Sequence, residues 1–152
     1  SETISLQRDA YRDFLSSISV RIDRGITLTL KQHRESFGLD GIKRVVTLTD
    51  DEVEKVAEEF MKRMNKRLLG RSNTTFKNSL FFLPVYERGT ISGRIHLHIA
   101  IGNLPEHISP KDFGATVVKV ARSLAWVDEQ IDIDWTPHKN NIINYLLFRF
   151  LI

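Results

Sequence analysis

The alternation of apolar and polar residues predicts four β-strands along the chain. In residues 25–30, Ile26, Leu28 and Leu30 alternate with hydroxylated residues, which is typical of a strand with one buried face. Residues 93–101 alternate in the same way, and a five-residue loop would join them to the preceding strand as a hairpin. The predicted strands are residues 25–30, 80–87, 93–101 and 131–135.

Helical spacing of apolar residues predicts the elements between the strands. The strongest helix begins after Thr49, where a capping-box pattern precedes an apolar stripe, and it should end near Gly70. The next helix opens at Ser109-Pro110, with serine as the cap and proline in the first turn. Two further helices are predicted, over residues 6–20 and from Thr136-Pro137 towards the chain end.

The order of these elements predicts the fold. Residues 33–46 are polar and contain glycine, so we expect a loop there with room for one short extra element. The remaining order contains strand–helix–strand–strand–helix–strand, which is the ferredoxin-like arrangement. We therefore expect one α+β domain over residues 1–152, a two-layer sandwich with an antiparallel sheet. Its helices should pack on one face of the sheet and leave the other face open.

Composition limits the possible functions without selecting one. The 152 residues include 22 Lys and Arg against 19 Asp and Glu, a formal charge of +3 that permits a nucleic-acid partner. Cysteine is absent, which excludes disulfides, thiolate metal sites and a cysteine nucleophile. No apolar run approaches the roughly 20 residues of a membrane span, so no membrane association is expected.

Two histidines on one predicted strand carry the sharpest chemical signal. If Leu97 and its alternate neighbours point into the core, His96 and His98 must point together to the opposite face. Two imidazoles placed in this way can bind a divalent metal ion, although two histidines on a solvated strand face have equal weight. Glu87 ends the neighbouring strand and is the candidate third ligand, or else an ordinary surface acid.

The last predicted helix offers a candidate nucleophile. His138, Asn141, Tyr145 and Arg149 recur at spacings of three, four and four, which would place them in one polar stripe. A tyrosine hydroxyl in such a stripe can attack phosphorus, and an arginine one turn later can stabilise phosphate charge. A boundary tyrosine with a packed ring and a solvated hydroxyl is the alternative.

Together these motifs resemble the HUH endonucleases, and among them the rolling-circle replication initiators. The triplet His96-Leu97-His98 is similar to their histidine motif, and residues 86–89 are similar to the segment that carries their metal-binding acid. Residues 26–30 resemble their first motif, a hydrophobic residue followed by Thr-Leu-Thr. Residues 144–147 resemble their tyrosine motif, and the order of the motifs also agrees.

The resemblance implies a site-specific nickase that acts on single-stranded DNA, at an origin or hairpin of a phage or plasmid. Glu87, His96 and His98 would hold Mg²⁺ or Mn²⁺ on an open catalytic face. Tyr145, assisted by Arg149, would form a 5′-phosphotyrosine link that a free 3′ hydroxyl can later reverse. DNA would lie along that face, which Asp132 and Asp134 would share. The candidate DNA contacts are Thr27, Thr29, Lys31, Arg88, Arg94 and Asn141.

Some positions depart from the family pattern and keep other functions open. Phe148 stands where the family usually has a lysine, with Arg149 next to it. A non-catalytic origin-binding or single-strand-binding module on the same fold is one alternative, and a single-tyrosine transposase is another. No P-loop is present, so a helicase would be a separate or fused partner. We expect the nuclease part of a longer protein, acting in the cytoplasm of a bacterial host.

Overall fold

The computed structural model describes residues 21–70, 80–88, 93–135 and 138–141 of the chain. Its main sheet contains β1 (Arg21–Leu30), β4 (Phe81–Arg88), β5 (Ile95–Gly102) and β6 (Val127–Asp134). The strands lie in the order β4-β5-β1-β6, and each neighbouring pair is antiparallel. Together with α2 (Asp50–Leu69) and α3 (Pro110–Arg122), these elements follow the predicted ferredoxin-like order. The prediction of an α+β two-layer sandwich is therefore confirmed.

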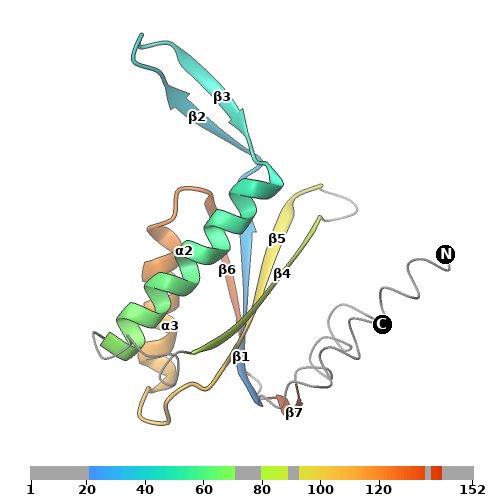
Figure 1. The fold of residues 1–152 in the computed structure, drawn as a ribbon, viewed down its shortest axis with the longest axis vertical. Coiled ribbons are helices and arrows are strands. Elements are labelled where there is room, and N and C mark those ends of the chain that lie inside the picture. Colours follow the sequence, from blue (N-terminus) through green and yellow to red (C-terminus); the bar gives the residue numbers. More distant parts are fainter. Residues whose placement is uncertain (1–20, 71–79, 89–92, 136–137, 142–152) are drawn as a thin grey trace, which may run out of the picture.

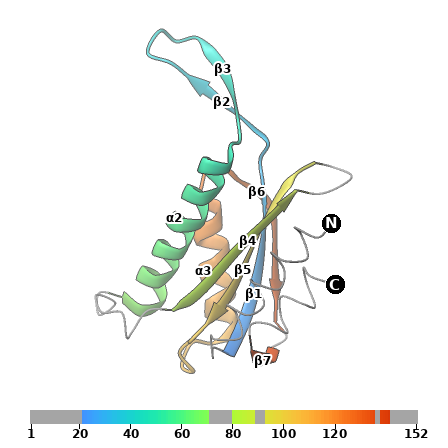
Figure 2. The ribbon, with the colours of Figure 1, turned by 45° about the vertical axis from the view of Figure 1, so that its right-hand side comes forward.

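The two helices lie on the same face of the sheet (Figures 1 and 2). Both are capped as the sequence indicates: the side chain of Thr49 accepts a hydrogen bond from the backbone of Glu52, and that of Ser109 accepts one from Asp112. Gly70 ends α2 with a positive φ of 67°, and its N–H donates to the carbonyl of Lys66. Local sequence therefore fixes where α2 begins and ends and where α3 begins.

The hydrophobic core fills the space between the sheet and these helices. Leu97 and Ile99 of β5 and Leu28 of β1 are at most 1% exposed, and they face Phe60 of α2 and Phe113 of α3. Because side chains alternate along a strand, the residues between them project to the opposite face. Of the helices that the structure describes, none covers that opposite face (Figure 2).

The loop predicted over residues 33–46 is wrong in most of its length. The segment forms a two-stranded antiparallel hairpin, β2 (His33–Phe37) and β3 (Lys43–Thr47), which projects away from the sheet and helices (Figure 1). The strands were missed because almost all of their side chains are exposed, so they lack the one-sided apolar alternation of a buried strand.

The helix predicted from Thr136-Pro137 is also wrong at its start, because His138–Asn141 forms strand β7. β1 begins at Arg21, four residues before the predicted strand, and β6 pairs with it only from Gly25 onward. β7 pairs with the first residues of β1 and so satisfies backbone groups that β6 leaves open. The helix predicted over residues 6–20 lies outside the described residues.

Candidate functional site

The two histidines of β5 occupy the face of the sheet opposite the helices. The alternate residues Ile95, Leu97 and Ile99 are buried, whereas His96 and His98 are partly exposed. The ring centroids of the two histidines lie 6.4 Å apart, with an angle of 27° between the ring planes. The predicted separation of buried apolar residues from paired imidazoles is thus what the strand shows.

Two threonines of β1 contact the histidines directly. The antiparallel register places Thr27 opposite His98 and Thr29 opposite His96. Thr27 Oγ1 lies 3.0 Å from Nδ1 of His98, and Thr29 Oγ1 lies 3.3 Å from Nδ1 of His96. Both rings are therefore oriented through Nδ1, and Nε2 is the nitrogen left to bind a metal ion.

Glu87 of β4 completes the cluster from the other side of β5. Its position is opposite His96, but its Oε1 lies 2.9 Å from Nε2 of His98. An ionised carboxylate only accepts hydrogen bonds, so in this arrangement Nε2 of His98 donates to Glu87. The hydroxyl of Thr27 can donate to or accept from Nδ1, which lets it support either tautomer of the ring.

Two imidazoles and one carboxylate are suitable donors for Mg²⁺ or Mn²⁺, and Mn²⁺ accepts nitrogen ligands more readily. As they stand, no three His, Asp or Glu side chains in the described part of the chain are grouped to hold a metal ion. A metal ion at this place requires Glu87 to release Nε2 of His98 and turn towards both rings. The exposure of the Glu87 side chain, 55%, leaves space for that rotation.

β6 adds two acids near the same face. The register places Asp132 opposite Thr27 and Asp134 opposite Gly25, on the strand edge that faces away from β5. Both follow the same alternation as the threonines, so they share the face of the histidines. The expectation that these aspartates border the open face agrees with this register.

The structure separates the other predicted DNA contacts by their surroundings. Thr29 is only 2% exposed and its hydroxyl contacts His96, so it is not available for a direct contact with DNA. Arg94 forms an ion pair with Asp128 of β6. Arg88 donates to the carbonyl of Gly93 at 3.1 Å, across the β4–β5 hairpin. Lys31 is exposed just beyond the end of β1.

The predicted nucleophile lies outside the part of the chain that the structure describes. This applies to Tyr145 and to Arg149. Asn141 lies in β7, opposite Arg21, which is six residues before Thr27 and thus about 20 Å from the histidines along the strand. Attack by Tyr145 therefore requires the chain after Asn141 to return along the sheet.

The role of the threonines as partners of the imidazoles was missed in the sequence. A signal was present, because Thr27 and Thr29 have the same spacing of two residues as His96 and His98. Antiparallel pairing of the two strands brings both pairs into register at once. Nothing local in either strand indicates that they are neighbours.

The geometry defines an α+β sandwich with a paired-histidine site on its helix-free face. A sequence profile of the replication-associated protein ORF2 family matches residues 43–149, which is more than half of the chain. The protein belongs to this family of replication-associated proteins. The matched range includes Glu87 and both histidines but not the threonines of β1. Neither curated proteins nor solved structures give a match.

The helices of the described residues also bear on where the protein can act. None of them combines the length and the apolar character needed to cross a membrane.

Proposed function

We propose that this protein is an HUH-type endonuclease that nicks single-stranded DNA at a specific site to initiate rolling-circle replication. The observation that carries the proposal is the cluster of Glu87, His96 and His98 on the helix-free face, with both rings held at Nδ1 by threonines. Membership of a replication-associated family supports the same direction. An origin or hairpin in single-stranded form is the proposed substrate, and a separate or fused helicase is the proposed partner.

Each residue of the cluster has a distinct task in this proposal. A bound Mg²⁺ or Mn²⁺ would supply Lewis-acid polarisation of the scissile phosphate. Thr27 and Thr29 keep the two imidazoles parallel enough to share one ligand position. Glu87 contributes negative charge, and Lys31, exposed at the end of β1, attracts the DNA backbone.

The chemical step assigned to Tyr145 is a transesterification. Its phenol oxygen forms a bond to phosphorus, and the bond from phosphorus to the 3′ oxygen breaks. The phenol proton leaves to solvent or a nearby base, and the released 3′ oxygen takes up a proton. Since one phosphoester replaces another, the strand can be rejoined by the reverse reaction without a nucleotide cofactor. Arg149 would stabilise the charge on the phosphate.

The decisive experiment uses a labelled single-stranded origin with Mn²⁺. We expect a protein–DNA adduct that survives denaturation, is lost in Tyr145→Phe and is lost on chelation. His96→Ala and His98→Ala should abolish the adduct while leaving the circular dichroism spectrum unchanged. An adduct of undiminished yield in Tyr145→Phe would contradict the assignment of the nucleophile.

A non-catalytic DNA-binding module on the same fold is the second candidate. The hydrogen bond between Glu87 and His98 favours it, because it occupies a nitrogen that metal binding needs. Phe148 at the position of the usual lysine favours it as well. DNA binding without any adduct, over a broad set of origin-like strands, would support this module and exclude the nickase.

A further inference from the structure

The β2–β3 hairpin, here called the arm (residues 33–47), exposes an unusual amount of apolar surface. Seven large apolar side chains are exposed in the described part of the chain, and five of them belong to the arm. Phe37 is 68% exposed, Val45 66% and Ile42 56%, and Leu39 at the tip is fully exposed. Grouped apolar side chains of this kind are characteristic of a protein-binding surface.

Interactions within the arm hold it in an extended shape. At the tip, Asp40 accepts a hydrogen bond from the backbone of Ile42 and forms an ion pair with Arg44 at 2.7 Å. Lys43 pairs with Glu35 across the strands at 2.6 Å. At the base, the guanidinium of Arg34 lies over the ring of Trp126, 5.0 Å from its centroid. Both acids of the arm are thereby neutralised, and the arm keeps one excess positive charge.

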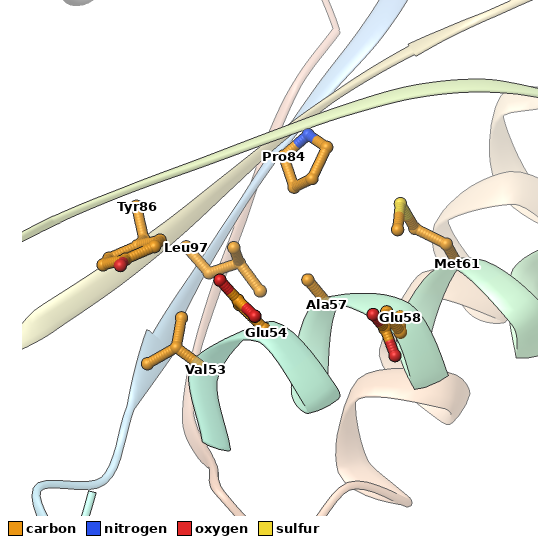
Figure 3. Close-up of a pocket in the computed structure, with 8 residues that line it drawn as sticks. All are labelled: Val53, Glu54, Ala57, Glu58, Met61, Pro84, Tyr86 and Leu97. Carbon is orange, nitrogen blue, oxygen red and sulfur yellow. The ribbon is translucent and has the colours of Figure 1, made fainter. Parts of the chain in front are cut away.

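A groove on the body of the protein has the opposite character. It lies between α2 and the edge strand β4, with a volume of about 280 Å³ (Figure 3). Its apolar lining is formed by Val53, Ala57, Met61, Pro84, Tyr86 and Leu97. Glu54 and Glu58, both exposed, flank this lining, and three more acids occupy the first turn of α2. The groove therefore suits an apolar segment with positive charge and repels the phosphates of DNA.

The arm of the same molecule does not fill this groove. Both views of the fold show the arm pointing away from α2 and β4 (Figures 1 and 2). An arm presented by another molecule has the required features, namely Phe37, Leu39 and Ile42 for the lining and Lys43 or Arg44 for the acidic rim.

We propose that the protein self-associates by inserting the arm of one copy into the α2–β4 groove of another. The two contacting surfaces are different, so the interface is heterologous, and copies join head to tail into a ring or an open chain. The apolar tip residues act as anchors, and the charges on the rim set the orientation. The proposal goes beyond the proposed DNA chemistry and does not depend on it.

Two variants of the full chain test the two surfaces separately. The arm variant carries Phe37→Ser with Leu39→Ser, and the groove variant carries Glu54→Lys with Glu58→Lys. All four positions are exposed, so both variants should keep the wild-type melting temperature. A matched control carries Glu106→Lys with Glu129→Lys, which makes the same charge change at exposed positions outside the groove.

Sedimentation velocity from about 1 to 200 μM, the range of weak to moderate affinities, is the measurement. We expect wild type and the control to form larger species as concentration rises, and each variant alone to remain monomeric. An equimolar mixture of the two variants should form a dimer and nothing larger, because only one intact arm and one intact groove remain.

Three results would overturn the proposal. One is a wild type that stays monomeric over the whole range. The second is a groove variant that still dimerises by itself, which would indicate a symmetric arm–arm contact. The third is a monomeric wild type that binds duplex DNA in fluorescence anisotropy when the arm variant does not, which would make the arm a DNA-binding element.

Discussion

At the scale of single residues, β5 separates stability from chemistry within one strand. Ile99 has no exposed surface, whereas His98 beside it contacts Thr27 and Glu87 on the other face. Adjacent residues of a strand point to opposite faces, so substitutions one position apart should have different consequences.

Ile99→Asp should unfold the protein, because it places a carboxylate in the core without a partner. We expect a loss of more than about 4 kcal/mol in the free energy of unfolding, against less than about 1 kcal/mol for His98→Ala. Urea denaturation followed by circular dichroism measures both values. A greater loss for His98→Ala than for Ile99→Asp would mean that the faces of β5 are assigned the wrong way round.

Thr27→Val should weaken binding of Mn²⁺ by about 10- to 100-fold, because it removes the hydroxyl that orients His98. Thr27→Ser should restore the affinity. Titration calorimetry provides the measurement, and the free energy of unfolding should change little. Thr47→Val is the matched control, since its hydroxyl lies 3.3 Å from Nδ1 of His33 on the arm, away from the site. Equal Mn²⁺ affinity in the two valine variants would refute the role given to Thr27.

At the scale of elements, end signals decide where α2 begins and ends. Thr49 supplies the cap, acids occupy the first turn, and Lys66 and Arg67 occupy the last turn, which suits the helix dipole. α2 also carries one wall of the groove, so its stability matters for more than the core.

Thr49→Ala should destabilise the protein by about 1 kcal/mol, because the N–H of Glu52 loses its acceptor. Thr49→Ser should recover most of that loss. Thermal unfolding of the three proteins provides the comparison, with Thr116→Ala as a control for removing a hydroxyl elsewhere on a helix. Stability equal to wild type in Thr49→Ala would show that water replaces the cap at no cost.

At the scale of the whole molecule, ion pairs and backbone hydrogen bonds favour the charged form of several carboxylates. The hydrogen bond from Arg44 lowers the pKa of Asp40, and that from Arg63 lowers the pKa of Glu59. The backbone N–H of Glu129, followed by the charge of Arg94, lowers the pKa of Asp128. The Arg94–Asp128 pair links β5 to β6 across the end of β1.

These lowered pKa values predict a loss of stability in acid. A carboxyl whose pKa is lower in the folded state stabilises the fold above its unfolded pKa, and this contribution disappears as the pH falls through the folded pKa. Asp128→Asn should therefore be less stable than wild type above about pH 5, and the difference should shrink below about pH 4. Urea denaturation from pH 7 to 3 measures it. A difference that grows towards low pH would contradict the sign of the shift.

Much of the fold and of the candidate site can be predicted from local patterns. The four strands of the main sheet, α2 and α3, and the shared face of His96 and His98 all follow from periodicity and caps. The arm could not be found in this way, because its strands are exposed on both faces. β7 could not be found either, because Thr136-Pro137 is a helix-start signal and only pairing with β1 makes His138–Asn141 a strand.

The sequence by itself determined which side chains are buried and which are displayed along each element, since that depends on a repeat of two or 3.6 residues within one segment. Only the tertiary structure decided that β1 lies between β5 and β6, which brings Thr27 and Thr29 to the two imidazoles. It also decided that the arm points away from a groove it could fill in another copy. Strand order and groove shape depend on contacts between residues far apart in the chain, which no local repeat encodes.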